Sequence, residues 1–216
     1  MNDVPKPPPE EQPPAPAPVA ETVPAAVGYP VSVGADRQEE YVRFLPLVKW
    51  LLLVPHYVVL FFLGIGAAVI AFVAFFATLI TGRYPEGMWD FMVGFQRWAL
   101  RVLAYLFLVT DDYPPFSLQE GPNDPVRLSA EYPEQVSRWR PLVAWLLILP
   151  YAIVAGLIGV IGQICAFFAL FTIIFTKKIP EGLFDVIRVS FNWQMRASFY
   201  GYWLSTEYPP FSWDDD

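Results

Sequence analysis

The sequence predicts an all-α integral membrane protein, built as a tandem repeat of two helical hairpins with about four membrane helices. Three observations predict it: the chain repeats itself at a constant shift, each copy holds a very long apolar run, and each copy holds a second long segment with arginines on one face. The hydrophobic fraction is 55% and the charged fraction 16%, against about 45–50% and about 25% in soluble domains. Such a composition indicates contact with lipid.

The stretch DDYPPFSL at 111–118 returns as TEYPPFSW at 206–213. The same shift of 95 residues, the distance from Pro46 to Pro141, continues without a gap from Pro30 to Leu118 in the first copy. It also aligns Trp50 with Trp145, Pro55 with Pro150, Asp90 with Asp185, and Arg101 with Arg196. A constant shift over rigid and bulky residues indicates a tandem duplication. The predicted units are repeat 29–118, linker 119–123 and repeat 124–216.

Residues 1–28 form a tail rich in Pro, Ala and Glu. The tail has no run of bulky apolar residues that would offset the entropy of ordering it, so we expect it to be disordered. It lacks a basic start followed by an apolar region and is therefore not read as a secretory signal. Two PxxP segments, 5–8 and 13–16, fit a proline-binding groove, but a plain spacer is favoured.

The apolar runs span Leu47–Thr81 and Leu142–Thr176, and Lys49 is their one charged residue. About 35 residues in a helix measure about 50 Å, against about 30 Å of hydrocarbon. We therefore expect kinks at Pro55 and Pro150, crossing helices over 56–81 and 151–176, and interfacial first turns anchored by Lys49, Trp50, Arg140 and Trp145. The alternative is a hairpin folded at Gly64-Ile65-Gly66, with two shorter spans.

The second helix of each repeat carries a polar stripe on one face. The stripe residues are Asp90, Arg97 and Arg101 in the first copy and Asp185, Arg188, Asn192 and Arg196 in the second. A charge at the bilayer centre costs at least about 2.5–3.5 kcal/mol. The stripe is therefore expected to face the protein interior, to line a wet cavity, or to lie at headgroup level.

Short motifs connect these helices. TGRYPEG and TKKIPEG suit type I turns with proline second, and YPPFS is expected to end the second helix at the interface, a recognition motif being the alternative. Val31–Val33 and Val126–Leu128 are candidate strands outside the membrane that pair across the repeats. Two crossings per repeat place both termini on one side, with the repeats related by an axis along the membrane normal. The lysine and arginine distribution favours cytoplasmic termini.

The segments RFLPLVKWLLLVPHYVVL, TGRYPEGMWDF and QRWALRVLAYLFLVTDDYPPFSL and their second copies resemble the bacterial membrane family called domain of unknown function 4389 (DUF4389). The resemblance covers both repeats. It implies a multi-pass protein of the bacterial inner membrane, and it implies no activity, ligand or cofactor. The second copy replaces Arg83-Tyr84 with Lys178-Ile179 and His56 with Tyr151.

Catalytic and metal chemistry find little support in the residue types. Cys165 is the single cysteine and His56 the single histidine, too few ligands for a zinc site. His56 could shuttle a proton or sense pH, but an interfacial filler is favoured since the second copy has tyrosine. Asp90 and Asp185 could act as acid and base or bind a cation, although a favourable position at a helix start is preferred. The net charge of −7 and the absence of a basic cluster argue against nucleic-acid binding.

Two functional hypotheses follow. The first is a non-enzymatic membrane scaffold or accessory subunit that meets membrane lipids and either a membrane-protein partner or further copies of itself. The second is a protein that binds or transports lipid or an anionic solute through Arg101 and Arg196, whose guanidinium groups suit phosphate. Arginines that snorkel to headgroups or pair with aspartate are the simpler reading. No cofactor and no catalytic residue is expected.

Overall fold

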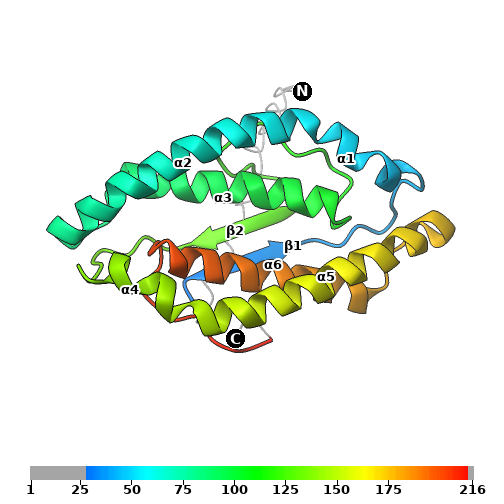
Figure 1. The fold of residues 1–216 in the computed structure, drawn as a ribbon. Helices are drawn as coiled ribbons and strands as arrows, with labels where there is room; N and C mark the ends of the chain where they lie inside the picture. The colour runs from blue at the N-terminus through cyan, green and yellow to red at the C-terminus, as the bar shows by residue number, and fades with distance from the viewer. Residues whose placement is uncertain (1–27, 214–216) are drawn as a thin grey trace, which may run out of the picture.

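The structure is a computed structural model that describes residues 28–213. Apart from Gly28, the predicted disordered tail lies outside the described residues. The elements, in chain order, are β1 (Val31–Ala35), the 3-10 helix η1 (Leu45–Leu47), α1 (Lys49–Leu52), α2 (Val54–Thr81), α3 (Glu86–Leu106), β2 (Val126–Ala130), α4 (Arg140–Leu147), α5 (Leu149–Thr176) and α6 (Glu181–Gly201). Figure 1 shows α2 and α5 as the two outer helices, with α3, α6 and both strands between them.

The two repeats have matching elements. The helices α2 and α5 each have 28 residues, α3 and α6 each have 21, and the strands each have 5. Their bounds differ by the same 95 residues that align the two copies of the sequence. Only the segments ahead of the long helices differ, since α1 has 4 residues and α4 has 8. The duplication read from the sequence is therefore also a duplication of structure.

Each long apolar run is broken just before its proline, as expected. The helix α1 ends at Leu52 and α2 begins at Val54, with Pro55 in its first turn. Pro150 holds the same place in α5. Proline has no N–H to bond the preceding turn, but it fits the first turn of a new helix. The alternative of a hairpin at Gly64-Ile65-Gly66 is wrong, because α2 runs through these residues without a break.

The predicted type I turns with proline second are also wrong. The reversals occur earlier, at Gly82 and Lys177, which end α2 and α5 in the left-handed conformation with φ of 73° and 59°. Pro85 then serves as the N-cap of α3, and Glu86 is its first residue. A left-handed residue satisfies the last carbonyls of a helix, so the chain has already turned when it reaches the proline.

The strands β1 and β2 pair antiparallel, with Val33 opposite Leu128. This confirms the expected pairing across the repeats. Each strand packs on the second helix of the other repeat, β1 on α6 and β2 on α3. Because Val33 and Leu128 occupy equivalent positions, a pseudo-two-fold axis passes between them, perpendicular to the sheet. The repeats are thus interlocked, and each helps to complete the core of the other.

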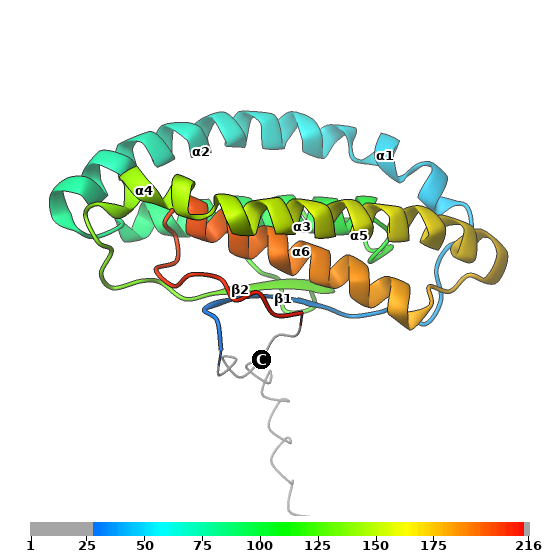
Figure 2. The same cartoon turned by 60° about the horizontal axis from the view of Figure 1, so that its bottom comes forward.

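The elements form three layers. Figure 2 shows the sheet below α3 and α6, with α2 on the opposite side of α3; α2 packs on α3 and α5 on α6. Between α3, α6 and the sheet lies a buried core that includes Val33, Leu100, Leu128, Ile187 and Phe199. The large exposed hydrophobic side chains lie mainly on segments 42–80 and 139–175. The molecule therefore has one apolar side, formed by α2 and α5, and one polar side, formed by the sheet.

Within residues 28–213, two helices, α2 and α5, are long and apolar enough to cross a membrane by length and composition. Only 11% of the most apolar window of α2 and 33% of that of α5 is buried. A core helix of a soluble domain would be mostly buried. Among the described residues, α3 and α6 do not meet this criterion of length and composition. Two of the four expected membrane helices therefore lack this support.

Candidate functional site

The polar stripes of α3 and α6 meet the sheet. The Asn192 Oδ1 accepts a hydrogen bond from the Val33 N–H at 3.2 Å, the Arg196 Nε donates to the Val31 carbonyl at 3.3 Å, and the Arg97 Nη2 donates to the Leu128 carbonyl at 3.3 Å. Each contact joins a helix of one repeat to a strand of the other.

These backbone groups are the ones that the two strands do not use between themselves. Asp36 N–H bonds the Pro125 carbonyl and Glu131 N–H bonds the Pro30 carbonyl, so residues 31 and 33 point their backbone groups outward at the strand edge. A buried edge leaves such groups without partners unless something else bonds them. The polar stripe therefore closes the edges of the sheet.

Arg101 holds the loop that connects α3 to β2. Its Nη1 lies 2.8 Å from Asp124 Oδ2 and 3.2 Å from the Gln119 carbonyl, and its Nη2 donates to the Ser117 carbonyl. Asp124 Oδ2 also accepts from the Gly121 N–H at 2.8 Å. Arg101 is 3% exposed and the Asp124 side chain 9%. The guanidinium is thus bonded to an internal carboxylate and to backbone carbonyls.

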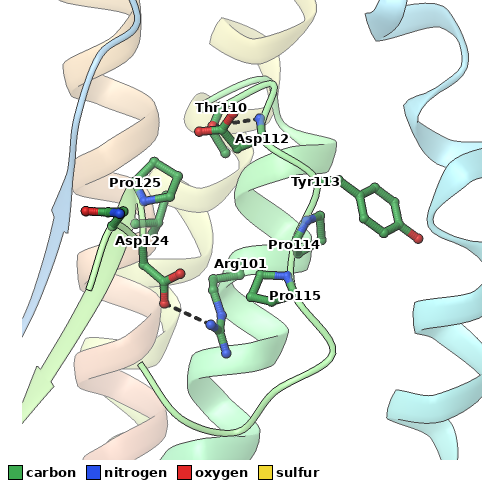
Figure 3. Close-up of a pocket in the computed structure, with 10 residues that line it drawn as sticks. Arg101, Thr110, Asp112, Tyr113, Pro114, Pro115, Asp124 and Pro125 are labelled. Atoms are coloured by element: carbon green, nitrogen blue, oxygen red, sulfur yellow. Dashed lines mark hydrogen bonds and ion pairs between the residues drawn. The ribbon is translucent and has the colours of Figure 1, made fainter. Parts of the chain in front are cut away.

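A small pocket opens beside this ion pair. Its volume is about 230 Å³, and its lining residues are Arg101, Thr110, Asp112, Tyr113, Pro114, Pro115, Asn123, Asp124, Pro125 and Val126. In Figure 3, Arg101 reaches from α3 toward Asp124, which precedes β2, while Pro114 and Pro115 pass close to the arginine. Both repeats contribute to the pocket. The carboxylate of Asp124, which also lines the pocket, neutralises the positive charge of Arg101.

The equivalent arginine in the second repeat has a different partner. Arg196 lies over the ring of Tyr29, with its guanidinium carbon 5.4 Å from the ring centroid. Tyr29 holds the position equivalent to Asp124. An aromatic face attracts a guanidinium, and burial raises the pKa of Tyr29 to about 12. The two arginines therefore have equivalent positions but not equivalent sites.

The remaining stripe residues, Asp90, Asp185 and Arg188, are not among those that line the pocket beside Arg101. Asp90 and Asp185 are exposed, and Arg188 is half-buried and has an interaction partner. Since α3 and α6 begin at opposite ends of the layer (Figure 1), the two aspartates do not form one acid–base pair.

The helix-start explanation of the aspartates is wrong in detail. The helices begin at Glu86 and Glu181, and Asp90 is only the fifth residue of α3. The favourable interaction with the helix dipole falls off within the first turn, so it belongs to the two glutamates. Among residues 28–213 no group of three or more His, Cys, Asp and Glu residues is placed to hold a metal ion.

A second buried ion pair joins Lys49 to Asp111, which the sequence analysis does not predict. Lys49 is fully buried, with its Nζ 2.7 Å from Asp111 Oδ1, 2.6 Å from the Thr110 carbonyl and 4.4 Å from the centroid of the Tyr105 ring. Its expected role as an interfacial anchor is therefore wrong. A signal existed: the equivalent positions in the second repeat are Ala144 and Thr206, so both charges are present in one copy and both are absent from the other.

The YPPFS motifs pack the aromatic side chains of each repeat together. In the first repeat, Phe116 stacks on His56 at a centroid distance of 3.9 Å, and Trp98 Nε1 donates to His56 Nδ1 at 2.9 Å. In the second, Tyr151 stacks on Trp193 at 4.7 Å. These clusters fasten the start of each long helix to the second helix.

Two expectations fail at these clusters. The prolines of the motif do not end α3, which already ends at Leu106. His56 does not fill an exposed position, because it is fully buried inside the protein. The YPPFS motif follows the end of the second helix and packs back against that helix.

The fold and the contacts of the polar stripe together define a tandem-repeat helical protein with two exposed apolar helices and a sheet shared between the repeats. The chain belongs to the family described as domain of unknown function (DUF4389), whose model matches residues 46–117 and again residues 138–212. This confirms the family and its two tandem copies. A search of curated proteins found no match, and a search of solved structures found none either.

Proposed function

We propose that this chain is a non-enzymatic protein of the bacterial inner membrane that serves as a scaffold or accessory subunit, with its termini on the cytoplasmic side. The observation that carries the proposal is the separation of the two faces. The apolar face of α2 and α5 exposes large side chains such as Phe61, Phe72 and Phe168. An exposed apolar area of this extent marks a membrane or protein contact.

The hydrogen bonds of the polar stripe support a structural role for its arginines. Arg97 bonds the Leu128 carbonyl, Arg101 bonds Asp124, and Arg196 bonds the Val31 carbonyl. A catalytic or transport site needs polar groups directed at a ligand, whereas these groups are directed at the chain itself. Such contacts are typical of a rigid platform.

The sheet side is the surface proposed for partners. Its exposed charged residues include Asp36, Glu120 and Glu131, and the outward-facing Arg127 pairs with Asp36 at 2.7 Å. A polar surface of this kind suits a membrane-protein partner with basic residues, or a second copy, in an interface rich in hydrogen bonds. Membrane lipids are the partners proposed for the opposite face.

A second candidate function is the binding of lipid or an anionic solute. The pocket of about 230 Å³ beside Arg101 favours it, because a guanidinium in a pocket is suited to phosphate. Asp124 weighs against it, since an anion would have to compete with a carboxylate already 2.8 Å from the arginine.

Native mass spectrometry of the full chain extracted from its membrane in mild detergent separates the two functions. The scaffold predicts a partner chain or a second copy at fixed stoichiometry, lost on Glu131→Lys and kept in the matched control Glu86→Lys, which alters a helix start instead. The lipid function predicts bound phospholipid that is lost on Arg101→Ala and Arg196→Ala. A monomer without partner chains, carrying arginine-dependent phospholipid, would overturn the scaffold.

A further inference from the structure

We propose that the chain lies flat in one leaflet of the membrane, with α2 and α5 along the plane of the bilayer and the sheet facing water. The partner of the apolar face is then a lipid monolayer with anionic headgroups. The inference rests on the proposed membrane role and replaces the multi-pass path expected from the sequence.

The position of the sheet along the helices indicates this orientation. Val33 bonds Asn192 and Leu128 bonds Arg97, and both helix residues are the twelfth of 21 in α6 and α3. The strands therefore lie beside the middle of these helices, not beyond their ends. If α3 and α6 crossed the bilayer, the sheet would lie at the centre of the hydrocarbon.

The outer face of the sheet is unsuited to that position. Arg127 and Asp36 form an ion pair whose side chains are 36% and 64% exposed, and Ser129 is exposed beside them. Hydrocarbon offers no hydrogen bonds, so open sheets and exposed ion pairs do not occur there against lipid. The sheet side therefore belongs in water, along the full length of the helices.

The pseudo-two-fold axis leads to the same orientation. The Val136 N–H bonds the Gly82 carbonyl, and the Tyr41 N–H bonds the Lys177 carbonyl, so each α2–α3 or α5–α6 turn lies beside the segment that leads into the apolar helix of the other repeat. The two turns lie at opposite ends of the layer (Figure 1). Crossing helices would put them on opposite sides of the membrane, whereas flat helices leave both turns and the sheet on one side.

The charges around the apolar face fit anionic headgroups. Exposed basic side chains lie at its two ends: Arg43, Arg83, Arg138, Lys177 and Lys178. Trp50, Trp139 and Trp145 are 58%, 70% and 59% exposed near the starts of the apolar segments. Basic residues and tryptophan around an apolar face are typical of proteins that lie in the interface. At 28 residues, α2 is about 42 Å long and exceeds the hydrocarbon thickness of about 30 Å.

Sidedness of labelling in the full chain tests the arrangement. In a Cys165→Ala background, single cysteines are placed on the sheet by Ser129→Cys and at the two turns by Glu86→Cys and Glu181→Cys. Phe62→Cys, on the exposed apolar side of α2, is the matched control. A membrane-impermeant maleimide is applied to intact spheroplasts and to inverted membrane vesicles.

The flat arrangement predicts that all three polar positions react from the same side only, by at least about tenfold, while Phe62→Cys is protected in both preparations. Reaction of the two turns from opposite sides, or of both turns from the side opposite to Ser129→Cys, would overturn it. Protection of Ser129→Cys in both preparations that persists when Glu131→Lys has removed the proposed partner would also overturn it, because the sheet would then lie in the hydrocarbon. A chain that stays in the soluble fraction contradicts the proposed membrane role itself, so the two failures are distinguishable.

Discussion

Val33 of β1 lies directly opposite Leu128 of β2, and the two residues hold the same position in their repeats. The central pair of the sheet is thus formed by the same sequence position of the two repeats. Because β1 packs on α6 and β2 on α3, the buried cluster that holds Val33 and Leu128 is built from both repeats. Stability is expected to depend on the sheet more than its size suggests.

Leu128→Ala is expected to lower the free energy of unfolding by about 2–5 kcal/mol, as for other large-to-small changes in a core. Leu128 is fully buried against both repeats. Chemical unfolding in mild detergent measures the change. The neighbouring Ser129→Ala, at an exposed position, is the control and should change stability by less than about 0.5 kcal/mol. Equal effects of the two substitutions would show that the sheet is peripheral.

Lys49→Met is expected to destabilise the fold by about 3–5 kcal/mol, because it leaves the largely buried carboxylate of Asp111 without its positively charged partner. Lys49 is fully buried and the side chain of Asp111 is 10% exposed. The double variant Lys49→Met with Asp111→Asn should recover most of the loss, since no unpaired charge remains. Unfolding of both single variants and the double variant completes the cycle, and strictly additive losses would contradict the ion pair.

Asn192→Leu is expected to cost about 1–3 kcal/mol, the penalty for leaving a buried donor unsatisfied. The donor is the Val33 N–H, 3.2 Å from Asn192 Oδ1. Hydrogen exchange of the β1 amides should also become faster. Asp185→Asn, on the same helix but exposed, serves as the control and should leave both quantities nearly unchanged. Unaltered protection of Val33 in the Asn192 variant would refute the role of the stripe at the sheet edge.

Alkaline pH should destabilise the fold. Burial raises the pKa of Tyr29 and of Tyr41 to about 12, from an ordinary value of 10.0. The unfolded chain therefore loses these protons first, and stability is full below about pH 10 and falls as the pH rises toward 12. Phenolate absorbance and unfolding, followed together, measure the effect. Tyr29→Phe and Tyr41→Phe should each weaken the pH dependence; an unchanged profile in both variants would count against these pKa values.

Much of the architecture is visible in the sequence because it follows from local chemistry. Pro55 and Pro150 interrupt a helix in any tertiary environment, because proline lacks the backbone N–H. The constant shift between the two copies indicates that the repeats have similar folds. The alternation of residue types around Val33 predicts the strand there. The contacts of the polar stripe do not follow from the sequence. Residue spacing shows which side chains share a helix face, but it does not show which element packs against that face. Asn192 and Arg97 acquire their roles only when strands of the opposite repeat reach them.

The pairing of Lys49 with Asp111 shows the same limit from another side. The two residues are far apart in the sequence, and each alone is typical of a membrane boundary. Only their joint absence from the second repeat, where Ala144 and Thr206 stand, links them. The positions of the helix reversals were missed for a different reason, since the left-handed residue Lys177 has no sequence signature as clear as that of Gly82.

Polarised infrared spectroscopy of the full chain in oriented anionic bilayers measures how the helices lie relative to the membrane plane. The amide I dichroism reports the mean direction of the helices, and α2, α3, α5 and α6 all run lengthwise along the molecule, roughly parallel to the sheet (Figure 2). We expect the helices to lie mainly in the plane of the bilayer. Helices aligned with the membrane normal would rule out the flat arrangement.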